Sequence, residues 1–222
     1  MITILVTGEP GTGKTSLLIN LSKRLGVVGV ISRPRVDEFG KRTGIVATFP
    51  DTGERIELAT VVRIPGDPRV AGLVAAPSTP GGADDDSRAA GSNAHVMVGP
   101  WRFSRGAIAD VNARLARIAE EAVRGGATSD AAHRSMPVVV IDEIGPLELL
   151  RHGGFLPGLE AVMRSALPAI VVVRPALVAE LRRTIGSFSE SRSPNRLHTV
   201  SISHPAQIEP TARRILAMLQ GL

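Results

Sequence analysis

The sequence predicts an α/β fold with a mostly parallel central sheet. Three observations support this class: apolar segments of strand length alternate with helical patterns, a glycine-rich turn separates the first strand from the first helix, and one central apolar segment ends in two carboxylates. Alternating strands and helices are typical of a parallel sheet covered by helices. A chain of 222 residues that is 43% hydrophobic is long enough for one well-buried core but too short for two full domains. We therefore expect one domain over residues 1–222.

The first strand and the first helix flank a glycine-rich loop. Residues 2–6 are mostly β-branched or leucine and predict a buried strand, while leucines at positions 17, 18, 21 and 25 recur at helical spacing. Between them, Gly8–Thr15 has the sequence GEPGTGKT. This is the pattern of a phosphate-binding loop, in the strand, loop and helix context that the motif requires.

The chemistry of this loop comes from its backbone. Gly11 and Gly13 permit positive φ and close approach, so the N–H groups from Gly11 to Thr15 can surround an anion at the positive end of the following helix. We assign Lys14 to the β- and γ-phosphates of a nucleoside triphosphate and the Thr15 hydroxyl to Mg²⁺. The residues expected to bind the nucleotide are Gly8, Glu9, Pro10, Gly11, Thr12, Gly13, Lys14, Thr15 and Ser16.

A second buried strand and a hairpin follow the first helix. Residues 27–31 predict the strand, and residues 41–62 predict an antiparallel hairpin added to the edge or face of the sheet. Residues 63–95 lack periodicity and are rich in proline, glycine and aspartate, so we expect a long, mobile surface loop there. We interpret the three aspartates at 84–86 as a solvated acidic segment rather than a metal site.

The second half of the chain alternates helices and strands. Apolar residues at positions 108, 111, 115, 118 and 122 step by three and four and predict an amphipathic helix, with Ser104 as its N-terminal cap. The elements expected after it are a strand at 138–141, a helix at about 153–166, a strand at 169–173, a helix at about 175–185, a strand at 197–202 and a final helix ending near Gly221.

Two carboxylates follow the strand expected at 138–141. In proteins with a phosphate-binding loop, a carboxylate at this point completes the Mg²⁺ shell, usually through a bound water, and we assign this role to Asp142. Glu143 lies one residue further, so we expect it beside the γ-phosphate, where it orients and deprotonates the attacking water. The pair predicts Mg²⁺-dependent hydrolysis of a nucleoside triphosphate to diphosphate and phosphate.

Arg33 is the candidate for a cation that stabilises the transition state. It comes directly after the strand expected at 27–31, at the sheet edge where Gly8 and Asp142 also emerge. An arginine there would balance the charge on the equatorial oxygens of the phosphoryl group. The alternative is a surface arginine that ends the strand before Pro34, and Arg102 is the next candidate.

Several segments resemble the THEP-type nucleoside-triphosphatases, which are called cancer-related nucleoside-triphosphatases in animals. Besides the Gly8–Thr15 loop, the similar segments are Gly29–Arg33, Arg42–Ile45, Val98–Trp101 and Asp142–Leu149. The resemblance implies a P-loop NTPase with a RecA-like three-layer sandwich that hydrolyses several nucleoside triphosphates with Mg²⁺ and little base selectivity. The chain departs from the family at Pro146, where the family has lysine, and in the length of the segment at 63–95.

Two other functions share the loop and the sheet. A nucleotide or nucleoside kinase would also need an acceptor pocket and an arginine-bearing lid, for which the arginines at 69, 88, 102 and 105 are available. A nucleotide-binding adaptor would change shape without hydrolysis. A guanine-selective switch is disfavoured because no Asn-Lys-x-Asp segment occurs. Trp101 could stack on a base, although packing in the core is the simpler role for it.

Composition limits the partners and the compartment. The net charge is +5, but the basic residues are spread along the chain and aromatic residues are only 3%, which disfavours nucleic acid as a partner. The chain has no cysteine, so it has neither disulfides nor thiolate metal sites, and its five histidines lack metal-binding spacing. With no signal-like start and no apolar run of about 18 residues, we expect a cytoplasmic protein without membrane contacts. The sequence does not indicate an oligomeric state.

Overall fold

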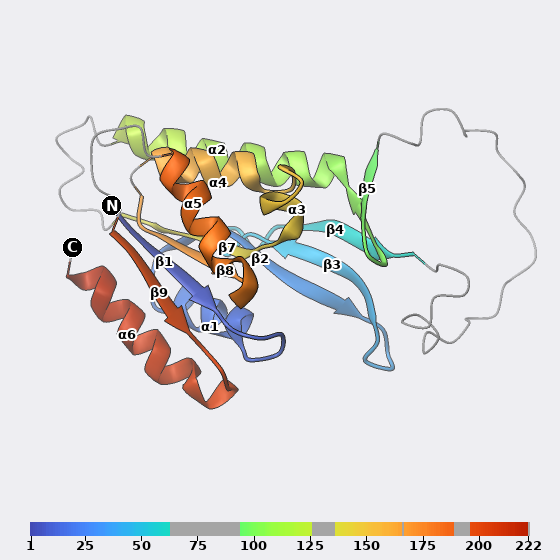
Figure 1. Cartoon of the computed structure of the whole chain (residues 1–222), viewed down its shortest axis with the longest axis horizontal. Coiled ribbons are helices and arrows are strands. Elements are labelled where there is room, and N and C mark those ends of the chain that lie inside the picture. Colours follow the sequence, from blue (N-terminus) through green and yellow to red (C-terminus); the bar gives the residue numbers. More distant parts are fainter. Residues whose placement is uncertain (63–93, 126–135, 166, 189–195, 222) are drawn as a thin grey trace, which may run out of the picture.

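The computed structural model describes residues 1–62, 94–125, 136–165, 167–188 and 196–221 of the chain. Its helices and strands alternate in the second half as expected (Figure 1). In chain order they are β1 (Ile2–Thr7), α1 (Lys14–Ser22), β2 (Val27–Val36), β3 (Arg42–Thr48), β4 (Arg55–Val61), β5 (His95–Val98), β6 (Trp101–Ser104), α2 (Arg105–Gly125), β7 (Val138–Ile144), α3 (Pro146–Leu149), α4 (Leu156–Arg164), β8 (Ala169–Val173), the 3₁₀ turn η2 (Pro175–Leu177), α5 (Val178–Phe188), β9 (Arg196–Ser201), the 3₁₀ turn η3 (Pro205–Gln207) and α6 (Ile208–Gln220).

The strands form one mixed sheet in the order β5-β6-β4-β3-β2-β7-β8-β1-β9. Among the described residues, four strand pairings are parallel and four are antiparallel. The prediction of a mostly parallel sheet was therefore wrong. The parallel half runs from β2 to β9, and two hairpins, β3–β4 and β5–β6, extend it beyond β2. Strands joined by short turns must pair antiparallel, because a parallel pair needs a long crossover.

Helices cover both faces of the sheet and produce three layers (Figure 1). α2, α4 and α5 lie on one face, and α1 and α6 lie on the other. Side chains alternate between the two faces along β1: Leu5 packs in the core under α2, α4 and α5, whereas Ile4 and Val6 pack in the core under α1 and α6. The strands β1, β7 and β8 are therefore buried on both sides, as their continuous apolar sequences predict.

Several element boundaries differ from the sequence-based expectation. β2 continues to Val36 because its exposed second half pairs with β3, and β7 continues through the carboxylates to Ile144. The hairpin expected at 41–62 is present as β3–β4, although it lies inside the sheet and not at its edge, because β6 pairs with β4. β5, β6 and the short α3 were not predicted. The loop predicted at 63–95, with its three aspartates, lies outside the described residues except at its last two positions.

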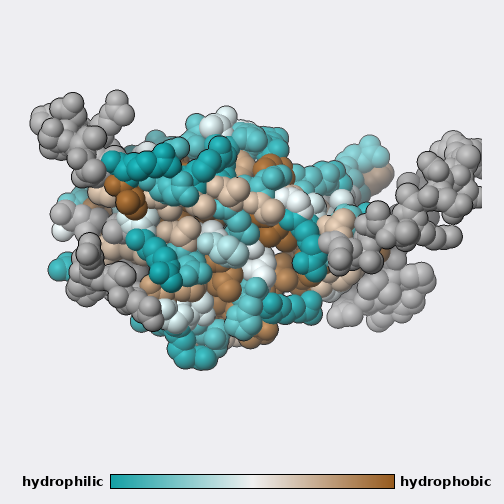
Figure 2. Space-filling view, turned by 90° about the horizontal axis from the view of Figure 1, so that it is seen from above, coloured by the Kyte–Doolittle hydropathy of each residue, from teal (hydrophilic) through white to brown (hydrophobic). Residues whose placement is uncertain are grey.

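α2 is amphipathic, as its apolar spacing predicts. Val111 and Leu115 are fully buried, and the view from the α2 side shows hydrophilic residues over much of that face, with hydrophobic residues scattered among them (Figure 2). Ser104 caps the helix, because its Oγ accepts a hydrogen bond of 3.2 Å from the backbone N–H of Ala107. None of the helices in the described part of the chain is long and apolar enough to cross a bilayer.

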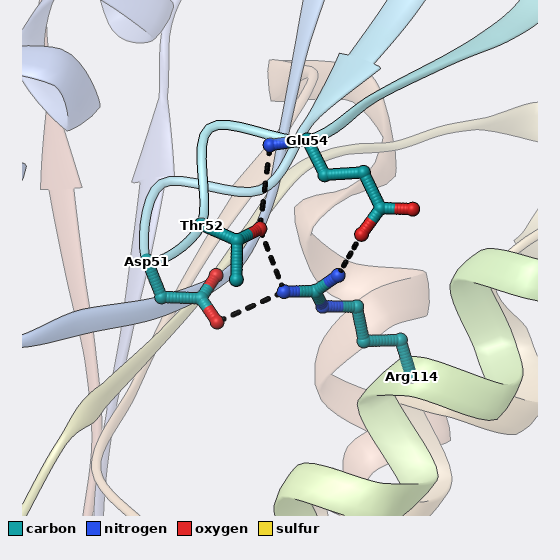
Figure 3. Close-up of polar contacts among 4 residues, drawn as sticks. All are labelled: Asp51, Thr52, Glu54 and Arg114. Atoms are coloured by element: carbon teal, nitrogen blue, oxygen red, sulfur yellow. Dashed lines mark hydrogen bonds and ion pairs between the residues drawn. The ribbon is translucent and has the colours of Figure 1, made fainter.

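Arg114 fastens the antiparallel half of the sheet to α2 (Figure 3). Its guanidinium donates hydrogen bonds to Asp51, Thr52 and Glu54 in the turn between β3 and β4, and it lies 4.1 Å from the centre of the Phe49 ring. The side chain is only 14% exposed, so these charge-assisted bonds are partly shielded from water. The contact fixes the first hairpin against the helical layer.

Candidate nucleotide-binding site

The loop between β1 and α1 is shaped by two glycines. Gly13 has a φ of 98° directly before α1, a left-handed conformation in which a side chain would be strained. A Cβ atom at Gly8 would lie 2.1 Å from the carbonyl oxygen of Ile202, so only glycine fits between β1 and the segment after β9. The loop therefore leads tightly into the N-terminus of α1, which is where backbone N–H groups bind anions.

Lys14 is the first residue of α1, and its side chain folds back over the loop. Nζ donates hydrogen bonds to the carbonyl oxygens of Gly8 at 2.7 Å and Glu9 at 2.8 Å. The Glu9 oxygen also accepts from the backbone N–H and the hydroxyl of Thr12, at 3.3 and 2.8 Å. These hydrogen bonds hold the loop in a compact conformation, with the ammonium group of Lys14 beside it.

Asp142 and Thr15, which the sequence assigns to one metal ion, are in contact. Asp142 is 3% exposed, and burial raises the pKa of its carboxyl group to about 7, although hydrogen bonds from the Thr15 hydroxyl and the Ser32 backbone N–H act in the opposite direction. Its Oδ2 atom is buried and has no hydrogen-bond partner among the described residues. A buried carboxylate oxygen without a partner is costly unless a cation or a donor occupies the space beside it.

The oxygen atoms at this position suit Mg²⁺. The described residues contain no group of three or more His, Cys, Asp or Glu side chains that could hold a metal ion by themselves. Mg²⁺ commonly takes one or two protein oxygens and completes its shell with water and substrate phosphates. Asp142 and Thr15 fit that type of site, because they supply a carboxylate and a hydroxyl next to the Gly8–Thr15 loop.

Glu143 is held by an arginine that the sequence interpretation did not single out. Nε of Arg174 lies 2.6 Å from Oε1 of Glu143, and the two side chains are 52% and 41% exposed. Arg174 directly follows β8, which lies between β7 and β1, so the strand order brings it to the same edge as the loop. Glu143 itself has a φ of 71°, which is uncommon for a residue with a side chain, and such strained residues are enriched at functional sites.

These residues surround a cavity of about 380 Å³ at the carboxyl ends of the parallel strands, and we name it the phosphate cavity. Its volume is in the range of small-molecule sites. Among the described residues, those that line it are Pro10, Gly11, Gly13, Lys14, Thr15, Ser16, Ser32, Arg33, Pro34, Arg42, Ile45, Trp101, Asp142, Glu143 and Arg174. Gly8, Glu9 and Thr12 are also predicted to bind nucleotide. They make the hydrogen bonds with each other and with Lys14 that hold the loop in its conformation.

Arg33 lines the phosphate cavity, but its position in the strand differs from the expectation. It lies within β2 opposite Val46 of β3, not after the end of the strand. Beyond Val30, β2 no longer pairs with β7, so Arg33 belongs to the antiparallel half. Arg102, the alternative candidate, is not among the described residues that line the cavity.

Glu148 supports the segment that follows the two carboxylates. It is 6% exposed, and its two carboxylate oxygens accept hydrogen bonds from the backbone N–H groups of Gly145, at 2.8 Å, and Phe155, at 3.1 Å. Burial raises the pKa of this carboxyl group, while the two backbone bonds lower it. Glu148 therefore ties α3 to the start of α4 and fixes the chain directly after Glu143.

Comparison with solved structures finds a likeness to the solution structure of a human cancer-related nucleoside triphosphatase. The TM-score is 0.58 and the sequence identity is 18%, and the alignment covers 100% of this chain and 98% of that chain. At this identity the likeness shows a common fold over the whole chain. No family model and no curated protein sequence matches the chain.

Proposed function

We propose that this protein hydrolyses nucleoside triphosphates to diphosphate and phosphate in the presence of Mg²⁺, with little selectivity among bases. The observation that carries the proposal is the phosphate cavity, where the Gly8–Thr15 loop, a buried carboxylate and an exposed carboxylate meet. The fold that the chain shares with a nucleoside triphosphatase agrees with this function.

The loop binds the triphosphate in this proposal. Backbone N–H groups from Gly11 to Thr15 surround the phosphates at the N-terminus of α1, where the helix dipole also favours negative charge. Lys14 turns from the carbonyl oxygens of Gly8 and Glu9 toward the β- and γ-phosphates, exchanging two neutral acceptors for charged ones. These contacts do not involve the base.

Thr15 and Asp142 hold Mg²⁺ in this proposal. When bound, the ion neutralises phosphate charge and orients the γ-phosphoryl group. The unpartnered Oδ2 atom of Asp142 then faces a cation or a metal-bound water, which favours the ionised carboxylate. Burial of this acid thus has a consequence for function: its Oδ2 atom gains a partner that stabilises the charge when the site is filled.

Glu143 activates the water. The water attacks the γ-phosphorus, its proton passes to the Glu143 carboxylate, and the bond from the γ-phosphorus to the bridging β-phosphate oxygen breaks. Arg174 orients Glu143 through the ion pair of 2.6 Å. Arg33 also lines the cavity, and we propose that it stabilises the charge that develops on the equatorial oxygens.

Phosphate release from ATP, GTP, CTP and UTP tests this function. We expect release from all four with Mg²⁺ and none with EDTA, and kcat/KM values that differ by less than about a thousandfold, because stacking alone contributes roughly 1 to 3 kcal/mol per base. Tight nucleotide binding without any phosphate release would instead identify an adaptor. Release of diphosphate only when an acceptor is added would identify a kinase.

A further inference from the structure

A second cavity, which we name the apolar cavity, adjoins the phosphate cavity. Its volume is about 180 Å³, and its walls come from the antiparallel half of the sheet, from α2 and from the segment around α3. The side chains that form its inner wall include Leu58, Phe103, Ile108, Leu147 and Phe155. This cavity opens toward the phosphate cavity, and no side chain of the described residues fills it, so its apolar walls are available to bind a small molecule.

The two cavities meet at the site of the proposed chemistry. Ser32, Asp142, Glu143 and Arg174 line both of them, as do Ile45 and Trp101. A molecule in the apolar cavity would therefore present its outer end to Glu143, in the place of the attacking water.

The polar groups of the apolar cavity restrict the kind of molecule that fits it. Glu148 reaches the inner wall, but both of its oxygens already accept backbone hydrogen bonds. The other polar side chains lie on the wall shared with the phosphate cavity. A nucleobase or a sugar would lose hydrogen bonds with water and gain few in return, which costs free energy. A hydrocarbon ring avoids that cost, and an engineered cavity of roughly 150 Å³ in another protein binds benzene.

We propose that the apolar cavity binds the ring of a small aromatic or alicyclic alcohol, whose hydroxyl group accepts the γ-phosphoryl group. The alcohol oxygen attacks the γ-phosphorus, the hydroxyl proton passes to Glu143, and the bond to the bridging β-phosphate oxygen breaks. The products are a phosphate monoester and a nucleoside diphosphate. This inference rests on the proposed binding of the triphosphate at the loop, and water takes the place of the alcohol when the apolar cavity is empty.

Binding of the alcohol can be measured without any turnover. Trp101 is the only tryptophan of the chain and lies in the wall of the apolar cavity, so its fluorescence reports whether the cavity is filled. We expect benzyl alcohol and cyclohexylmethanol to change this signal saturably in the presence of Mg²⁺ and a non-hydrolysable ATP analogue. Glycerol, which lacks a ring, should have no such effect. The absence of a saturable change with both ring alcohols overturns the inference.

Two substitutions in β5 give a test variant and a matched control. Val98 lines the apolar cavity, so Val98→Phe fills it, whereas the neighbouring Met97 is 42% exposed and does not line it, so Met97→Phe adds the same ring elsewhere. We expect at least a tenfold loss of alcohol affinity in Val98→Phe alone. Ile108→Phe is a second filling variant in case Val98→Phe does not fold, as judged by circular dichroism.

Transfer is then followed by ³¹P NMR with ATP, Mg²⁺ and benzyl alcohol or cyclohexylmethanol. Wild type and Met97→Phe should form the phosphate monoester, and Val98→Phe should release only inorganic phosphate while keeping its affinity for the ATP analogue. Inorganic phosphate alone in the wild type, or undiminished ester in the filled variant, contradicts the inference. If the wild type does not bind the ATP analogue at all, the proposed function itself is wrong. That result is distinct from a wild type that binds the analogue but forms no ester.

Discussion

The parallel and antiparallel halves of the sheet contribute different parts of the site. In the parallel half, the loop after β1, the carboxylates of β7 and Arg174 after β8 meet because their strands end at one edge. In the antiparallel half, Arg33 and the apolar cavity depend on how hairpins pack against α2 and α3. The comparison teaches that strand order brings together the Gly8–Thr15 loop, the two carboxylates and Arg174, whereas the packing of the hairpins forms the remaining walls.

Lys14→Ala should have the largest effect, because it removes a cation from the parallel half that contacts phosphate in both the ground state and the transition state. We expect nucleotide binding and turnover to disappear together. Isothermal calorimetry with the ATP analogue measures the binding, and Lys23→Ala, on the exposed end of α1, is the control. Unchanged affinity in Lys14→Ala would show that the loop does not bind phosphate.

Asp142→Asn tests whether the buried carboxylate lowers the free energy of unfolding when no ligand is bound in the parallel half. Because the pKa of Asp142 is raised from 3.8 to about 7 in the folded protein, the free energy of unfolding should fall as pH rises from about 4 through 7. Neighbouring charges on Glu143 and Lys14 contribute to this shift in opposite directions. An amide has no charge to bury, so the variant should have a higher free energy of unfolding than the wild type at pH 8, by up to about 4 kcal/mol.

Urea unfolding at pH 5 and pH 8, without Mg²⁺ or nucleotide, measures this difference, which should shrink toward the lower pH. An asparagine variant that is less stable than wild type at pH 8 would contradict the raised pKa. The same variant should bind Mg²⁺-nucleotide more weakly than wild type, because an amide oxygen is a poorer partner for the ion.

Arg33→Ala and Arg174→Ala compare how much one arginine from each half of the sheet contributes to kcat. We expect Arg33→Ala to lower kcat by at least a hundredfold with nucleotide affinity retained, because an arginine at the transferring phosphoryl group is typically worth about 10³ to 10⁵. Arg174→Ala should lower kcat by about tenfold, because Glu143 loses its orientation but keeps its carboxylate, so only part of the contribution of general base catalysis is lost. Arg174→Lys should recover most of that loss if the ion pair positions Glu143.

Steady-state kinetics of the three variants decide between the two cations. If Arg33→Ala stays within about threefold of wild type, below 1 kcal/mol of barrier, the antiparallel half does not supply the transition-state cation. A larger loss in Arg174→Ala than in Arg33→Ala would assign that role to the parallel half.

Arg114→Ala should loosen only the antiparallel half. It removes hydrogen bonds to Asp51, Thr52 and Glu54 from a guanidinium that is 14% exposed, so we expect a loss of about 1 to 3 kcal/mol in the free energy of unfolding. Arg124→Ala, which breaks an exposed pair on the same helix, should cost less than about 0.5 kcal/mol. Affinity for the ATP analogue should be unchanged in both variants. A large loss of affinity in Arg114→Ala would mean that the two halves are not independent.

Local patterns made the parallel half predictable. The Gly8–Thr15 loop and the carboxylates after residue 141 could be identified because each motif is complete within a few residues of strand and loop. Arg174 could not be paired with Glu143, since 31 residues separate them and only the strand order brings them together. A signal was nevertheless present: like Arg33, Arg174 follows an apolar stretch of sequence and precedes a proline.

Several features of the antiparallel half could not be predicted from the sequence, for physical reasons. β5 and β6 have four residues each, which is too few for a periodic pattern to distinguish a strand from a loop. The exposed end of β2 is polar and becomes a strand only through its pairing with β3. The apolar cavity has no local sequence signal, because its walls come from residues between 32 and 174.

The central claim, that this site hydrolyses nucleoside triphosphates with Glu143 as the base, is tested most directly by Glu143→Gln. The amide keeps the size of the side chain and one oxygen that can accept a hydrogen bond from Arg174 but cannot take a proton, so calorimetric affinity for the ATP analogue with Mg²⁺ should stay within about threefold of wild type. Single-turnover phosphate release should fall by roughly 10² to 10⁴, the usual contribution of general base catalysis. Release that persists near the wild-type rate, or an equal loss of binding and release, would contradict the account.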